Sequence, residues 1–232
     1  MTTPTPLAVV TGPSRGIGRA TALALAARRT RLALVGRASD ELESVLVECT
    51  EAGSPEARLF PTDLRDLEAT ARAGAAVLRE LGVPDVVIHN AGVVHRRSVE
   101  ELDLELFREQ LDVNLGAPYA LTRALLPALR AAGRGRILFV GSISGTLGTP
   151  RLSAYCASKW GVIGFMKSLA EEISDSGLMT CAILPGSVPT RMLEGSGFPP
   201  RMTTEDVART LTFFALDAPL AHNGAVVEMF GV

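Results

Sequence analysis

The chain has 232 residues, of which 47% are hydrophobic and 21% charged, and its net charge at pH 7 is −2. This length fits one large α/β domain with a substantial core. The balanced charge argues against nucleic acid or an anionic membrane as a partner, and no uninterrupted apolar run approaches the roughly 18 residues of a membrane span.

Short β-type runs alternate with longer helical stretches along the chain. We predict strands over residues 7–11, 32–35, 58–60, 86–89, 136–140, 179–184 and 225–230. We predict helices over residues 17–28, from 39–40 onward, and over 66–81, 98–130, 154–174 and 203–216, with an interruption of the 98–130 helix near Gly116-Ala117-Pro118. Apolar strands that are each followed by a helix favour a doubly wound, mostly parallel seven-stranded sheet, the Rossmann fold, in a single domain over residues 1–232.

The segment TGPSRGIG, residues 11–18, lies between the first strand and the first helix. Gly12, Gly16 and Gly18 allow a tight turn and the close approach of a phosphate, which the helix N-terminus attracts. A glycine triad alone also fits a plain turn, but the strand–loop–helix context favours a dinucleotide site. No Gly-Lys-Ser/Thr follows, so the segment is not a P-loop.

The charges after the second and third strands bear on which dinucleotide binds. Gly36-Arg37 stands where an NAD-binding protein places an acid, and Arg15 in the glycine loop adds a second guanidinium. Two arginines at the adenosine ribose suit a 2′-phosphate, so we predict NADP(H), although two solvated surface side chains are the alternative. We expect Asp63 either to bind the adenine amino group or to cap the next helix.

The stretch from Ser142 to Lys159 carries the candidate chemistry. Tyr155 and Lys159 are four residues apart, which on a helix places phenol and ammonium on one face. The ammonium is expected to lower the pKa of the phenol, ordinarily about 10, toward the range of an acid–base catalyst. Ser142 can then hold the reacting oxygen. Alone, the same spacing also fits a helix start with an incidental aromatic residue.

Cysteine usage indicates the cellular compartment. Cys49, Cys156 and Cys181 are odd in number and have no paired spacing, which favours free thiols in a reducing cytoplasm, and we predict no metal site. Cys156 follows Tyr155 directly and is either a buried thiol or a reactive one. The first residues, MTTPTP, show no basic region followed by an apolar core, so we expect no signal peptide.

These motifs together resemble the short-chain dehydrogenase/reductase family, in its small single-domain branch with members like the 3-oxoacyl-acyl-carrier-protein reductases. The likeness covers essentially the whole chain. The motifs that carry it are TGPSRGIG (11–18), Asp63, HNAG (89–92), Asn114, Ser142, YCASK (155–159) and PGSVPT (185–190).

The resemblance implies a role for each matching residue. Tyr155 would be the general acid/base, and Lys159 would lower its pKa and hold the nicotinamide ribose. Ser142 would orient the carbonyl, and Asn114 would hold a water of a proton relay. His89, where the family often has asparagine, is expected to pack structurally. The implied cofactor-binding residues are Gly12, Ser14, Arg15, Gly16, Ile17, Gly18, Arg37, Asp63, Asn90, Ala91, Gly92, Tyr155, Lys159, Pro185, Gly186, Val188 and Thr190.

The implied activity is hydride transfer between NADP(H) and a carbonyl compound or secondary alcohol whose identity stays open. The alternative is a catalytically idle NADP-sensing or scaffold protein of the same fold. The substrate lid, about 190–202, is short, and apolar Leu147, Met192, Leu193 and Phe198 favour a partly hydrophobic substrate. A homotetramer or homodimer is implied through the helices around 112–132 and 154–174. Their apolar faces fit packing on the sheet equally well: Leu121, Leu125 and Leu129 on the first, and Val162, Phe165 and Leu169 on the second.

Overall fold

A computed structural model of the protein describes residues 5–231 and contains one seven-stranded sheet in the order β3-β2-β1-β4-β5-β6-β7. Residues 1–4 and 232 of the predicted domain lie outside the described part. All neighbouring strands pair in parallel. The strands are β1 (Leu7–Thr11), β2 (Arg31–Gly36), β3 (Ala57–Pro61), β4 (Val86–His89), β5 (Gly135–Val140), β6 (Leu178–Pro185) and β7 (Ala225–Met229). Each predicted strand boundary therefore agrees to within one residue.

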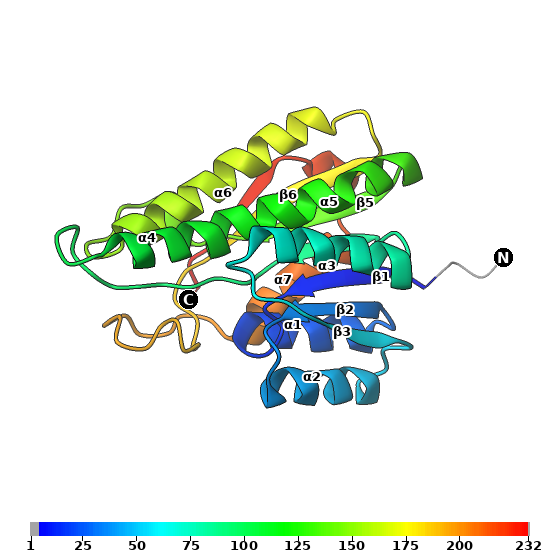
Figure 1. Ribbon diagram of the computed structural model, residues 1–232, viewed down its shortest axis with the longest axis horizontal. Coiled ribbons are helices and arrows are strands. Elements are labelled where there is room, and N and C mark those ends of the chain that lie inside the picture. Colours follow the sequence, from blue (N-terminus) through cyan, green and yellow to red (C-terminus); the bar gives the residue numbers. More distant parts are fainter. Residues whose placement is uncertain (1–4, 232) are drawn as a thin grey trace.

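Helices cover both faces of the sheet, as Figure 1 shows. One face carries α1 (Gly16–Ala27), α2 (Asp40–Glu51) and α7 (Thr204–Leu216). The other carries α3 (Leu67–Glu80), α5 (Ala117–Ala132) and α6 (Ser153–Glu172), with α4 (Leu104–Leu111) leading into α5. Along β1, Ala8 and Val10 join the first core while Leu7 and Val9 join the second. This two-sided burial explains why the strands read as continuous apolar runs.

Polar side chains at the helix starts explain several boundaries. Ser39, Asp66 and Asp103 each accept a hydrogen bond from a backbone N–H in the first turn of α2, α3 and α4 respectively. Thr203 and Asp206 form a reciprocal capping box at α7. The expectation that Asp63 caps the third helix is wrong, because Asp66 does so. Helix α1 has no side-chain cap, which leaves its N-terminal amides for another partner.

The stretch predicted as one helix over residues 98–130 begins later than predicted. Residues 98–103 form turns and extended backbone, so the helix begins only at Leu104. The interruption predicted near Gly116–Pro118 is confirmed as a π-helical turn, Asp112–Gly116, which ends two residues before Pro118. Gly116 keeps helical φ and ψ, so α4 runs into α5 as one continuous helix, and Pro118 supplies no N–H to it. The wide turn displaces Asn114 from regular helical geometry.

The apolar faces of α5 and α6 pack on the sheet. Leu121, Leu125, Leu129, Val162 and Leu169 are all buried in the core of that face. These residues therefore hold the fold together and are not available to a second subunit.

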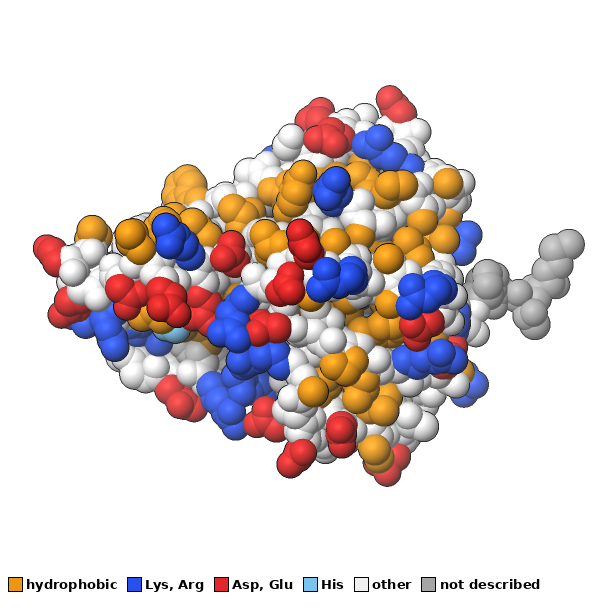
Figure 2. All heavy atoms as spheres, viewed as in Figure 1, with side chains coloured by type: hydrophobic (Ala, Val, Ile, Leu, Met, Phe, Trp, Pro, Cys, Tyr) orange, Lys and Arg blue, Asp and Glu red, His pale blue; other side chains and the backbone are white. Residues whose placement is uncertain are grey.

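The visible surface carries mixed charge. Figure 2 shows acidic and basic side chains interspersed over one face, with hydrophobic side chains scattered between them. This distribution agrees with the net charge of −2. Within residues 5–231, no helix is both long enough and apolar enough to cross a membrane.

The burial of α5 gives a stability prediction. Leu121→Ala, at a fully buried position, should lower the free energy of unfolding by about 2–5 kcal/mol, because it removes apolar contacts and leaves a cavity. Leu104→Ala, at a position 68% exposed, is the control and should change it little. Urea denaturation measures both variants, and equal effects would contradict the packing described above.

Candidate active site

The candidate residues gather at the carboxyl ends of the central strands. The glycine loop follows β1, Asn90 follows β4, Ser142 follows β5 and Gly186 follows β6. Strands β1 and β4 are neighbours in the sheet, yet their following helices cover opposite faces. This is the switch point at which parallel α/β sheets bind ligands.

The glycine loop has the geometry that a dinucleotide needs. Gly12 and Gly16 have φ of +63° and +55°, a region that favours glycine. A Cβ atom on Gly18 would lie 2.1 Å from the Gly12 carbonyl oxygen, so only glycine fits there. The loop ends at the uncapped N-terminus of α1, whose amides and dipole favour a phosphate. These features fit the predicted cofactor.

Hydrogen bonds tie the glycine loop to the end of β4. The Asn90 side-chain amide donates to the carbonyl oxygens of Thr11 and Gly12, both at 3.0 Å. The Thr11 hydroxyl accepts the backbone N–H groups of Asn90 and Ala91, at 3.0 and 3.1 Å. Asn90 therefore shapes the loop with its amide, in addition to lying beside the predicted cofactor position.

A second contact brings the segment after β6 to the same loop. A Cβ atom on Gly16 would lie 3.1 Å from the Thr190 side chain, so PGSVPT reaches the glycine loop. The Gly186 backbone N–H donates to the Met229 carbonyl oxygen at 2.8 Å, which joins the start of this segment to β7. Val188 is buried in the core beneath it.

The region around the end of β2, where the adenosine ribose is expected and which we call the adenosine corner, contains a carboxylate as well as arginines. Arg15 and Arg37 are both exposed, as predicted for a phosphate site. Glu41, in the first turn of α2, lies 3.6 Å from Arg15 and 2.8 Å from Arg191 of the lid segment. The sequence prediction overlooked this carboxylate. Any anion bound by Arg15 therefore competes with Glu41 for the guanidinium.

Asp63 is engaged by a neighbour. Its carboxylate accepts hydrogen bonds from the Arg65 guanidinium and from the Arg65 backbone N–H. These bonds lower the pKa of Asp63, and the charge of Arg37 contributes a smaller lowering. A bond from Asp63 to an adenine amino group would therefore have to share the carboxylate with Arg65.

Helix α6 positions the phenol and the amine. Tyr155 and Lys159 are 7% and 4% exposed and lie one turn apart, as the spacing predicts. The Lys159 Nζ lies 5.7 Å from the centroid of the Tyr155 ring and donates to the Val140 carbonyl oxygen at 2.9 Å. The Tyr155 hydroxyl donates to the Met192 thioether at 3.6 Å. Ser142 accepts a hydrogen bond from the Ser144 N–H at 3.1 Å, at the start of the 3-10 turn Ile143–Gly145.

Burial sets the protonation of this pair. It raises the pKa of the Tyr155 phenol, and hydrogen bonding with the Ser142 hydroxyl partly opposes the rise. It lowers the pKa of Lys159 to about 8. Both directions follow from the cost of holding a charge away from water. In the protein alone the phenol pKa thus moves opposite to the direction that the Tyr–Lys spacing predicts.

Asn114 connects the loop after β4 to helix α6. Its Oδ1 accepts the Val93 N–H at 2.8 Å, and its Nδ2 donates to the Val93 carbonyl and to the Ser158 hydroxyl, both at 3.0 Å. Ser158 in turn donates to the Tyr155 carbonyl oxygen at 2.7 Å. A Cβ atom on Gly92 would lie 3.3 Å from the Asn114 Oδ1 and 3.7 Å from the Lys159 Nζ. The two side chains therefore approach the same glycine.

His89 and the cysteines have structural roles. The His89 ring stacks on Phe139 and pairs with the Thr122 hydroxyl, and burial lowers its pKa to about 3, which keeps it neutral. The three cysteines are unpaired and buried, and burial raises the pKa of Cys49 and of Cys181 to about 12. Thiols with such pKa values remain protonated and inert.

The side chains of the lid segment are more buried at its start than toward its end. Met192 and Leu193 are half-buried, and Met192 contacts the Tyr155 hydroxyl. Leu147 and Phe198, predicted beside the same pocket, are 52% and 60% exposed. Only the start of the lid therefore closes on the candidate active site.

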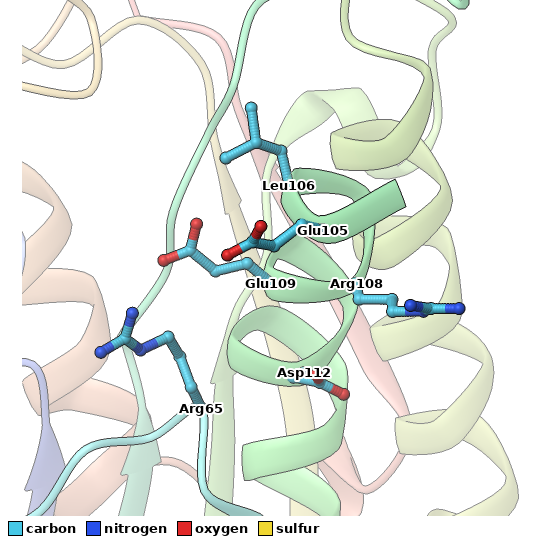
Figure 3. Close-up of a pocket in the computed structure, with 6 residues that line it drawn as sticks. All are labelled: Arg65, Glu105, Leu106, Arg108, Glu109 and Asp112. Atoms are coloured by element: carbon cyan, nitrogen blue, oxygen red, sulfur yellow. The ribbon is translucent and has the colours of Figure 1, made fainter. Parts of the chain in front are cut away.

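A surface hollow of about 390 Å³ lies outside this site, on the outer side of α4 (Figure 3). In the figure, Glu105 and Glu109 extend toward Arg65 while Arg108 points away. Glu109 is also engaged by the His95 ring at 2.7 Å. Arg65 is likewise paired with Asp63, so two of the charged lining residues already have partners outside the hollow, which fits a solvated groove better than a ligand pocket. Its lining residues are Arg65, Glu105, Leu106, Arg108, Glu109 and Asp112.

Several residues of the site escaped the sequence prediction. Thr11 and Ser158 join segments far apart in sequence through hydrogen bonds. Glu41 was visible as an acid in the first turn of α2, and Arg96 as part of the HRRS run after β4. The sequence does not show which distant residues Glu41 and Arg96 contact.

Comparisons with known proteins agree with this geometry. The family profile described as short chain dehydrogenase matches residues 6–197. The 3-oxoacyl-[acyl-carrier-protein] reductase of Synechocystis is 31% identical, covering 93% of this chain and 91% of the relative. The trans-4-hydroxycyclohexanecarboxylate dehydrogenase of Sinomonas cyclohexanicum is 32% identical, covering 97% and 91%.

A solved structure is similar over nearly the whole chain. It is a provisionally assigned NAD(P)-dependent gluconate 5-dehydrogenase from Beutenbergia cavernae, with NADP bound at low occupancy. Its TM-score is 0.90 and its sequence identity 32%, covering 96% of this chain and 94% of that chain.

The buried amine gives a pH-dependent prediction. The pKa of Lys159 is about 8 when folded and 10.5 when free, so between these pH values the unfolded state binds more protons. As the pH rises through this window, the parent should gain stability relative to Lys159→Met, by up to about 1.4 kcal/mol per pH unit. Urea denaturation between pH 7 and 10.5 measures the difference, with Lys167→Met as the control for lost surface charge. A constant difference would contradict the burial of a charged Lys159.

Proposed function

The chain belongs to the short chain dehydrogenase family, a family of oxidoreductases that use nicotinamide cofactors, and we propose that it transfers hydride between NADP(H) and a carbonyl compound or secondary alcohol. The observation that carries the proposal is the placement of the Tyr155 hydroxyl. It lies beside Ser142 and one turn from Lys159, and Met192, in the segment after β6, contacts it.

The bound nicotinamide would supply the hydride. Tyr155 gives a proton to the carbonyl oxygen in reduction and removes it in oxidation. Because burial holds the phenol protonated at neutral pH, it is in the form that reduction requires. Ser142 donates a hydrogen bond to the same oxygen, and preorganised donation of this kind commonly contributes about 3–4 kcal/mol per donor.

Lys159 and Asn114 are placed to relay protons to and from the Tyr155 phenol. The ammonium of Lys159, in this structure bonded to the Val140 carbonyl, lies on the same helix face as Tyr155. With a pKa of about 8, it is close to the pH at which it can take up and release a proton. Asn114 approaches it across Gly92, which suits the water-mediated relay that the family resemblance implies.

The preference for NADP(H) rests on Arg15 and Arg37. Both side chains are exposed at the end of the glycine loop and of β2, with no acid at the end of β2 itself. Residues that would hold the rest of the cofactor are the loop glycines, the Asn90–Gly92 turn and the segment from Pro185 to Thr190. Glu41 weakens the preference by pairing with Arg15.

We also propose a cytoplasmic homodimer or homotetramer. The free cysteines suit a reducing compartment. On the outer faces of α5 and α6, Tyr119 and Trp160 are 53% and 55% exposed, and such side chains suit a subunit contact. Light scattering of the purified protein measures the stoichiometry.

Turnover of a carbonyl substrate tests the proton-transfer assignment. Tyr155→Phe should lower kcat roughly 10²–10⁴-fold while leaving NADPH affinity nearly unchanged, because it removes only the hydroxyl. Tyr119→Phe, at the one other tyrosine, is the matched control and should retain activity. NADPH absorbance with trans-4-hydroxycyclohexanecarboxylate, gluconate and a 3-oxoacyl thioester, the compounds named for the relatives, provides the first assay. If Tyr155→Phe keeps most of its activity, Tyr155 is not the proton donor. If the parent binds the cofactor but turns over none of the compounds, the alternative of a catalytically idle NADP-sensing protein is favoured.

Cofactor affinities test the charge argument separately. The parent should bind NADPH more tightly than NADH, and Arg37→Asp should reverse this preference, because a carboxylate repels the 2′-phosphate and accepts from a 2′-hydroxyl. We expect a change in the ratio of at least about 10-fold, the scale of one charge-assisted hydrogen bond. Titration calorimetry with both cofactors measures it. Equal affinities in the parent would refute the NADP(H) proposal.

A further inference from the structure

Arg96 lies in the loop after β4, and three side chains of the α4–π-turn segment hold that loop in place. Asn114 binds both the N–H and the carbonyl of Val93. The Gln110 side chain accepts the His95 N–H at 3.0 Å, and Glu109 pairs with the His95 ring. The backbone immediately before Arg96 is therefore fixed, so the direction of its side chain is set by the fold.

The Arg96 guanidinium carries a charge that the protein leaves without an anion. It donates to the Met192 carbonyl at 2.5 Å and to the Glu194 carbonyl at 3.3 Å, both neutral groups of the lid. Within residues 5–231, no carboxylate lies within ion-pair distance of it. The residue is nevertheless half-buried. By contrast, Arg65 and Arg191 nearby are paired with acids.

The unpaired charge lies close to the reacting group. Met192 contacts Arg96 through its backbone carbonyl and the Tyr155 hydroxyl through its thioether. A single lid residue thus separates the guanidinium from the phenol. The charge of Arg96 also opposes the rise in the Tyr155 pKa, in keeping with this proximity.

We infer that Arg96 determines substrate specificity by binding a carboxylate on the substrate, so that the natural substrate is a hydroxy acid or oxo acid. The inference rests on the proposed function and adds the chemical class of the substrate. The planar guanidinium presents donors that match a carboxylate in pairs. In this structure two of its five donors are directed at lid carbonyls, and a carboxylate replaces these weaker neutral acceptors.

The gap between Arg96 and Tyr155 sets a size for the substrate. The carboxylate and the reacting carbon must be separated by about the width of the Met192 side chain, which now spans the gap between Arg96 and Tyr155. A partly apolar body fits this gap, because the thioether of Met192 lines the lid there. Binding requires the start of the lid to shift Met192 away from the phenol.

Matched substrates test the inference. The probes are trans-4-hydroxycyclohexanecarboxylate and its neutral methyl ester, oxidised with NADP+ by the parent, Arg96→Met and Arg96→Lys. The parent should prefer the acid in kcat/KM. Arg96→Met should lower kcat/KM for the acid roughly 10- to 100-fold, the value of a charge-assisted hydrogen bond, mainly through KM, and leave the ester nearly unchanged. Arg96→Lys should retain part of the preference, since it keeps the charge without the paired donors.

The control is Arg97→Met, which removes the neighbouring, exposed guanidinium and should leave the acid preference intact. Equal losses for acid and ester in Arg96→Met would mean that Arg96 only fastens the lid, and would overturn the inference. So would a parent that turns over the ester as well as the acid, a result that leaves the proposed function standing. If neither probe is oxidised, calorimetric binding of the acid to the NADP+-loaded parent and to Arg96→Met decides, and equal or absent binding overturns the inference.

Discussion

The close approach of the glycine loop to the end of β4 is the constraint on which the rest of the site depends. A side chain at Gly12 would meet the Ala91 backbone at 2.9 Å, and one at Gly18 would meet the Gly12 carbonyl. Asn90 and Thr11 fasten the two segments by hydrogen bonds. Because β1 and β4 are adjacent but send their helices to opposite faces, this contact opens the edge where cofactor and substrate can meet.

Burial at this edge of the sheet determines the protonation of Tyr155 and Lys159. Tyr155 and Lys159 lie on a helix packed against the sheet, and exclusion of water favours the neutral form of each. The hydrogen bonds from Asn114 to Ser158, and from Ser158 to the Tyr155 carbonyl, run from the π-turn to this helix. The irregular turn therefore has a mechanical consequence, since it brings Asn114 within reach of both α6 and the loop after β4.

The start of the lid meets three separate parts of the site. Arg191 pairs with Glu41 at the adenosine corner, the Met192 thioether accepts the Tyr155 hydroxyl, and the Met192 carbonyl accepts from Arg96. Two consecutive lid residues therefore contact Glu41 of α2, the phenol and the unpaired guanidinium. In the proposed complex, a movement of this short segment would exchange these internal contacts for contacts with ligands.

The sequence by itself determined the strand boundaries, the single doubly wound domain and the motif residues, because apolar runs, capping residues and glycine spacing act locally. It located the helix interruption near Gly116–Pro118, because proline is a local signal, but it did not show that the interruption is a π-helical turn. It also reversed the direction of the Tyr155 pKa shift, because the burial of the phenol raises that pKa. The partners of Arg96 were decided only by tertiary structure: it meets residues about a hundred positions away, and only the folded sheet brings them together.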